Sequence, residues 1–215
     1  MNARILLKIS SILLTPSKFF ASAKKEKGIG DAFKYYFSIS LIPAIATTLL
    51  ALILGLAMSS LYQGALGETA VAGSIINIVV FGFVWITGIV WRFIAAGMLH
   101  AFAKILGAKN YYSETYKAVV YSNTPHQITA LLFPIMWIPA IGSMVWLLIW
   151  TICGFYALYL SIVGMSVLHN MSMGKAAGAV LLTACTGLAV GFFVFIAIAG
   201  FITGFIEATT NSGYV

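Results

Sequence analysis

Charged residues are scarce in this sequence, and their scarcity excludes most soluble folds. They make up 8% of the 215 residues, whereas about 25% is usual for a soluble domain. Hydrophobic residues make up 61%, and the mean hydropathy is +1.03. The composition therefore predicts an integral membrane protein, and the length suffices for about five to seven spans of roughly 20 residues each.

Acidic residues and cysteines are scarcer still, which argues against an enzyme or a metalloprotein. The five Asp and Glu form no pair within an apolar run, and the sequence contains no GxSxG or HExxH motif. Cys153 and Cys185 lie in apolar runs without metal-ligand spacing, and we interpret them as small packing residues. The three histidines lack a paired Cys or carboxylate that would complete a zinc site. We expect no catalytic residues, no metal and no cofactor.

Basic residues are in excess, and most of them lie near the N-terminus. The formal net charge is +7, and seven of the twelve Lys and Arg fall in the first 34 residues, beside an apolar helical pattern. No nucleic-acid recognition motif accompanies them, so a membrane surface is favoured over nucleic acid as the partner. The residues expected to contact anionic lipid headgroups are Arg4, Lys8, Lys18, Lys24, Lys25 and Lys27.

Residues 4–14, RILLKISSILL, have the period of an amphipathic helix. Apolar residues such as Ile5 and Ile12 share one face, while Lys8 lies on the other. We expect this helix to lie in the headgroup region, and Pro16 to end it before a second short helix. A secretory signal is the alternative, but the Lys-rich stretch after the candidate cleavage site is in the wrong order for export.

The apolar runs predict an all-α bundle of five transmembrane helices, at 36–58, 75–104, 115–136, 142–168 and 177–206. Lys and Arg alternate between the loops as the positive-inside rule requires, which places the N-terminus in the cytoplasm and the C-terminus outside. The expected parts are a cytoplasmic basic amphipathic segment (1–34), a five-helix transmembrane domain (35–208) and a short outer tail (209–215). We expect a multi-pass protein of the cell membrane.

One arginine falls within a predicted span. Arg92 lies 12 residues before Lys104, which places it about 18 Å from the cytoplasmic end of its helix, near the middle of a hydrocarbon core about 30 Å thick. His126 lies 12 residues beyond Glu114 on the next, antiparallel span, so it is expected at the same depth. Pro125 cannot donate a backbone hydrogen bond, and the resulting kink should free carbonyl groups for the guanidinium.

These residues predict a polar cluster inside the membrane, because ionisable residues at that depth need partners. Two interpretations stay open. In one, carbonyl groups, Asn123 and a lipid phosphate neutralise Arg92; in the other, a polar cavity receives an anion, a lipid headgroup or a permeant ion. The cluster comprises Arg92, Tyr121, Asn123, Pro125, His126 and Gln127, and a second polar group near the cytoplasmic side comprises His100, His169 and Lys175.

The last predicted span is rich in glycine. Three pairs of glycines stand four residues apart, at 174 and 178, 187 and 191, and 200 and 204. Such spacing lets helix backbones approach closely. Packing within one chain is one interpretation, and a homo-oligomer through this helix is the other.

Four motifs follow one another along the chain: TPSKFF before a Lys-rich stretch, LHAFAKILGAKNYYSETYKAVVYSNTP, PIMWIPAIGSMVWLL, and VLHNMSMGKAA before the last span. Their order resembles the Yip family, membrane proteins named for their interaction with Ypt and Rab GTPases, in its compact prokaryotic form. The resemblance implies corresponding positions at His100, Gly107, Tyr121, Pro125, Pro134, Gly142, His169, Ser172, Lys175 and Ala176.

The resemblance implies a non-enzymatic membrane protein with a trafficking or membrane-shaping role. Two functions stay open at this point. The first is a scaffold that inserts its amphipathic N-terminal helix in the cytoplasmic leaflet and recruits partners or alters curvature. The second is a transporter, channel or lipid-handling protein with a polar cavity around Arg92. Expected partners are membrane lipids, with protein partners and a second copy of the chain left open.

Overall fold

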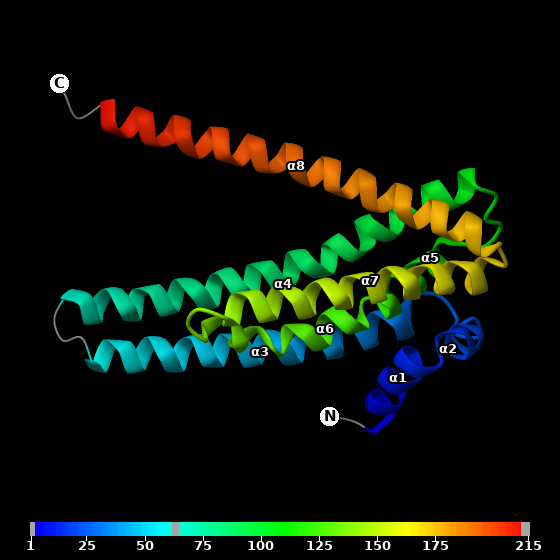
Figure 1. Cartoon of the computed structure of the whole chain (residues 1–215), viewed down its shortest axis with the longest axis horizontal. Helices are drawn as coiled ribbons and strands as arrows, with labels where there is room; N and C mark the ends of the chain where they lie inside the picture. The colour runs from blue at the N-terminus through cyan, green and yellow to red at the C-terminus, as the bar shows by residue number, and fades with distance from the viewer. Residues whose placement is uncertain (1–2, 62–64, 212–215) are drawn as a thin grey trace.

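The computed structural model describes residues 3–61 and 65–211, and all regular structure in these ranges is helical (Figure 1). The elements are α1 (Ala3–Leu14), α2 (Pro16–Ala23), α3 (Gly30–Leu61), α4 (Ala65–Ile105), α5 (Tyr112–Ser122), α6 (Thr124–Ala130), a 3₁₀ helix η1 (Phe133–Trp137), α7 (Gly142–His169) and α8 (Met173–Asn211). The predicted all-α class is confirmed. Residues 212–215 of the predicted outer tail lie outside the described residues.

Four helices in the described part of the chain are long and apolar enough to cross a membrane, namely α3, α4, α7 and α8. They cover the predicted first, second, fourth and fifth spans, and a multi-pass membrane protein is confirmed. The predicted third span, 115–136, is divided into α5, α6 and η1, so the number of five spans is not confirmed. The orientation across the membrane stays a prediction.

The broken segment α5–α6–η1 runs beside α7 in the opposite direction, as Figure 1 shows. Ser161 in the second half of α7 donates a hydrogen bond of 2.8 Å to Ser122 at the end of α5. At the other end, the rings of Phe133 in η1 and Trp146 near the start of α7 lie 5.9 Å apart. The three pieces therefore follow α7 over most of its length, as one interrupted helix.

A tight turn joins η1 to α7. Ala140 has a positive φ of 68°, and the Gly142 N–H donates to the Ile138 carbonyl at 3.0 Å. A Cβ atom at Gly142 would collide with the carbonyl oxygen of Ile135, so only glycine fits where α7 begins.

The two N-terminal helices are docked on the bundle. Ile12 of α1 and Phe20 of α2 are fully buried in the core. A Cβ atom at Gly164 of α7 would lie 2.9 Å from the Phe20 ring, so glycine is needed for this close approach. Tyr156 of α7 donates a hydrogen bond to the carbonyl of Leu13, near the end of α1. Part of the apolar face of α1 therefore packs on the protein itself, and the location of this helix in the headgroup region stays a prediction.

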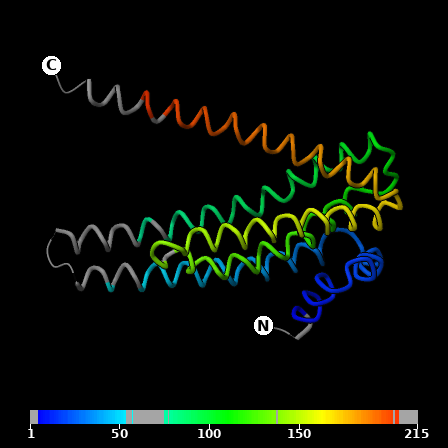
Figure 2. Tube along the Cα trace, viewed as in Figure 1, coloured from blue at the N-terminus to red at the C-terminus, as the bar shows by residue number. Residues whose placement is uncertain are grey.

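Helix α8 contacts α4 and α7 only over its first part and then diverges from both, as Figure 1 and the trace in Figure 2 show. Ala176, Ala179 and Val180 are buried, whereas the described side chains from Leu188 onward are exposed. A Cβ atom at Gly187, and likewise at each of the three later helix glycines at 191, 200 and 204, would have nothing within 4 Å. These four glycines therefore do not serve packing within one chain.

Candidate functional site

A charged cluster attaches α1 to the bundle. Lys8 of α1 forms an ion pair of 2.9 Å with Glu26, which lies between α2 and α3, and donates a hydrogen bond of 2.8 Å to the Tyr121 hydroxyl of α5. Tyr121 in turn donates to the other Glu26 oxygen at 2.6 Å. The side chains of Lys8 and Glu26 are only 24% and 20% exposed. Lys8 was expected at the membrane surface, and the structure instead turns it inward, because Glu26 and three aromatic rings surround its ammonium group.

The break between α5 and α6 is stabilised by the chain's own hydroxyl groups. Pro125 lacks the N–H that would bond the Tyr121 carbonyl, and the Thr124 hydroxyl takes its place at 2.7 Å. The Thr124 oxygen also pairs with the Tyr35 hydroxyl of α3 at 2.9 Å. The expectation that this carbonyl is freed for Arg92 is therefore wrong.

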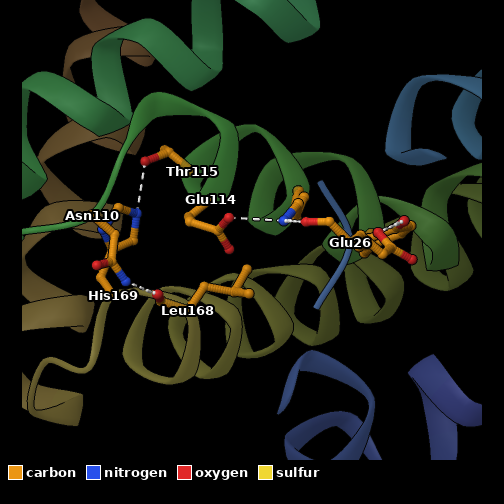
Figure 3. Close-up of polar contacts among 8 residues, drawn as sticks. Glu26, Asn110, Glu114, Thr115, Leu168 and His169 are labelled. Atoms are coloured by element: carbon orange, nitrogen blue, oxygen red, sulfur yellow. Dashed lines mark hydrogen bonds and ion pairs between the residues drawn. The ribbon is translucent and has the colours of Figure 1, made fainter. Parts of the chain in front are cut away.

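A second ion pair lies deeper in the same region. Lys117 is fully buried and forms a 2.8 Å ion pair with Glu114, and its ammonium also donates to the Glu26 backbone carbonyl at 2.7 Å. Figure 3 shows Glu114 and Glu26 on either side of this ammonium. Lys117 is therefore a core residue that joins α5 to the segment after α2.

Two histidines meet through a threonine where α4, α5 and α7 converge. The Thr115 hydroxyl lies 2.8 Å from His100 Nδ1 and 2.9 Å from His169 Nε2. Asn110 donates to the carbonyl of Leu168 beside this group, as Figure 3 shows. His100 and His169 were predicted to share a side of the membrane, and the structure brings them together.

Lys175, the third member of that predicted group, is exposed, and its ammonium lies 3.8 Å from where a Cβ atom of Gly107 would be. It therefore sits over the loop between α4 and α5. Gly107 has a positive φ of 95°, which favours glycine at this position of the loop. Within the described residues, no group of three or more His, Cys, Asp or Glu side chains could hold a metal ion.

The structure separates the residues of the predicted intramembrane cluster. Arg92, Asn123 and His126 line one pocket of about 470 Å³, together with residues of α5 and α7. Gln127 lines a separate pocket of about 290 Å³ between α3, α4, α6 and α7. Tyr121 belongs to the cluster of Lys8, and Pro125 is buried at the start of α6. Arg92 donates through Nε to the Tyr36 hydroxyl at 3.3 Å, so its described protein partner is on α3.

The remaining basic residues of the N-terminal segment stay on the surface. Lys18, Lys24, Lys25 and Lys27 are exposed, and Lys24 donates a 2.6 Å hydrogen bond to the Asn170 side chain after α7. The side chain of Arg4 is outside the described part of the structure. Apart from Lys8, the described basic residues thus agree in exposure with a surface role.

Sequence reasoning missed Glu26. It stands among Lys24, Lys25 and Lys27, and a single carboxylate in such a run of charges is expected to be exposed to solvent. The available signal was its rarity, because Glu26 and Asp31 are the only acidic residues among the first 34. Its partners Lys8 and Tyr121 are distant in sequence, so only the fold identifies them.

The comparisons with known proteins agree with the helical membrane architecture. A family model, the Yip1 domain, matches residues 10–198, which is most of the chain. The searches of curated proteins and of solved structures give no match. The matched region includes α2, the Lys117 and Arg92 clusters, α3, α4 and α7, and most of the candidate span in α8. The protein therefore belongs to the Yip family.

Proposed function

We propose that this protein is a non-enzymatic membrane scaffold that shapes the bilayer or recruits partners through α1 and α2. Membership of the Yip family supports a role within membranes. The observation that carries the proposal is the docking of α1 and α2, which the pair of Lys8 and Glu26 fixes to α5. A helix held in this way displaces lipid in one leaflet at a constant angle, unlike an amphipathic segment on a flexible tether.

The outer surface of the docked pair has the chemistry of such a wedge. Leu7 and Leu14 are 67% and 79% exposed and offer apolar side chains to the bilayer. Lys18 and Lys25 are also exposed and suit anionic headgroups. The transport alternative has less support, because the pockets of Arg92 and Gln127 have separate linings that share only Trp150.

The test replaces the exposed leucines and leaves the buried residues of the pair intact. Leu7→Ser combined with Leu14→Ser should leave the fold intact and reduce the deformation of anionic liposomes, because these side chains insert in the lipid but pack little on the bundle. Electron microscopy of liposomes at equal protein density measures the deformation. Deleting residues 1–30 is a poorer test, since it also removes Phe20 from the core.

Ile105→Ser is the matched control, because Ile105 is an exposed apolar residue at the end of α4. The control should deform liposomes like the wild type. Equal liposome shapes for the wild type, the double variant and protein-free vesicles would contradict the wedge.

A further inference from the structure

The pocket around Arg92 contains nitrogen donors that the protein does not use. Asn123 is only 5% exposed, yet its Nδ2 has no hydrogen-bond partner among the described residues. Nδ1 of His126 is also buried and unpartnered there. A buried N–H without a partner is destabilising, so the unpartnered amide of Asn123 indicates a missing acceptor, and His126 Nδ1 is a further donor in the tautomer that protonates this nitrogen.

The guanidinium of Arg92 has spare donors as well. Its Nε bonds the Tyr36 hydroxyl, and neither terminal nitrogen has a hydrogen-bond partner among the described residues. The two described ion pairs, Lys8 with Glu26 and Lys117 with Glu114, leave Arg92 without a carboxylate. No acidic residue lines the pocket. An anion with several oxygen atoms fits this combination of charge and donors.

The mouth of the pocket is apolar and faces outward. Phe155 is 70% exposed and Trp150 is 36% exposed, and both line the pocket with Leu158. A lipid can therefore approach from the bilayer with its acyl chains against these side chains. A small inorganic anion would gain nothing from them, so the lining favours a phospholipid over free phosphate.

The position of α1 indicates how deep this pocket lies in the membrane. Tyr156 of α7 bonds the carbonyl of Leu13 in α1, and Gly154, which lines the pocket, is two residues away, or about 3 Å along the helix axis. In the proposed function α1 is an interfacial helix, whose apolar face is buried about 5–10 Å into the boundary between headgroups and acyl chains. The count of residues along α4 therefore overestimates the distance between this pocket and the lipid phosphates of the leaflet that contacts α1.

We propose that this pocket binds the phosphate group of an anionic phospholipid from the leaflet that contacts α1. Arg92 supplies the charge and a planar pair of donors, and Asn123 Nδ2 donates to a second phosphate oxygen. His126 lies against Trp150, with ring centroids 4.5 Å apart, and closes the side of the pocket toward α6. The choice of leaflet rests on the proposed function, in which α1 lies in the membrane interface, whereas the binding of phosphate concerns a different surface of the bundle.

The experiment measures ligand binding to the full chain purified in a neutral detergent. The ligands are a short-chain phosphatidylglycerol, the diacylglycerol of the same chains, and inorganic phosphate, and native mass spectrometry and thermal unfolding report binding. We expect phosphatidylglycerol to bind and to stabilise the wild type. Arg92→Gln should weaken this binding about tenfold or more, because a charge-assisted hydrogen bond is lost. Lys104→Gln is the matched control, an exposed cation on the same helix, and should bind like the wild type.

Thr151→Trp is a second variant, for the case that Arg92→Gln does not fold. Thr151 is exposed at the mouth of the pocket, so a large side chain there should obstruct the lipid without disturbing the core. Binding of inorganic phosphate that depends on Arg92 and displaces the lipid would keep the phosphate site but assign it to a free anion. Equal binding of diacylglycerol and phosphatidylglycerol, or equal lipid affinity in wild type, Arg92→Gln and Thr151→Trp, would overturn the proposal.

Discussion

The ion pair of Lys117 and Glu114 distinguishes the interior of this protein from an ordinary apolar bundle. Lys117 is fully buried, and its ammonium is satisfied by Glu114 and by the carbonyl of Glu26. A buried charge is tolerated only with such partners, because removal from water costs several kcal/mol per ion. The cluster thus ties the segment after α2 to α5 by polar contacts that an apolar substitution cannot reproduce.

The two partners of the buried ion pair should respond differently to substitution. Glu114→Gln leaves the Lys117 ammonium buried without its carboxylate, and we expect a loss of about 3–5 kcal/mol in the free energy of unfolding. Lys117→Met removes the buried charge itself, so its loss should be smaller. Denaturant unfolding in detergent micelles measures both, with exposed Lys109→Met as the control. A larger loss for Lys117→Met than for Glu114→Gln would contradict this account of the pair.

At the scale of the elements, the interruption between α5 and α6 organises the polar groups. It places Asn123 at the pocket of Arg92 and Tyr121 at the cluster of Lys8, one on each side of the segment. Thr124 holds the interruption through Tyr35 and the Tyr121 carbonyl. In an unbroken helix the Tyr121 carbonyl would accept a hydrogen bond from the backbone N–H of residue 125, and Pro125 lacks this N–H.

Thr124→Val tests the role of this hydroxyl. The Tyr121 carbonyl and the Tyr35 hydroxyl would both lose a buried partner, and we expect a loss of about 1–3 kcal/mol in the free energy of unfolding. Thr186→Val is the matched control, because the half-buried Thr186 bonds only the Leu182 carbonyl of its own helix. The control should change stability by less than about 0.5 kcal/mol. Equal losses for the two variants would show that the hydroxyl does not maintain the interruption.

Hydrophobic runs predicted four of the five helices well, because apolar length alone determines which segments can span a bilayer. They could not predict that 115–136 is broken, since Pro125 is compatible with a kinked but continuous helix. The convergence of Arg92, Asn123 and His126 on one pocket agrees with the residues singled out from sequence. Tyr36 and Glu26 could not be found in this way, because their contacts join segments that only tertiary packing brings together.

At the scale of the whole molecule, α8 is the element with the least support from the chain. Gly187 and Gly191 face open space, and glycines four residues apart are suited to close helix contacts. We propose that a second copy of the protein packs here.

The variant Gly187→Ile with Gly191→Ile should lower the fraction of oligomer while the unfolding temperature of the single chain stays unchanged. Mass photometry in nanodiscs measures the oligomer. Gly82→Ile is the control, because Gly82 of α4 is equally open but has no glycine four residues away. Identical mass distributions for the wild type and both variants would argue against contact through α8.

The proposed function depends on the docking of α1 and α2 on the bundle, and a single cross-linking measurement tests this docking. Lys24 and Asn170 are both exposed, and their side chains lie 2.6 Å apart across the boundary between α2 and the end of α7. With Cys153 and Cys185 replaced by alanine, Lys24→Cys and Asn170→Cys should be joined by a short bismaleimide in nanodiscs, independently of protein concentration. The pair Lys24→Cys and Thr203→Cys, which joins α2 to the distant end of α8, should stay unlinked. Docking predicts efficient cross-linking of the first pair within one chain, and a yield no higher than that of the second pair would contradict it.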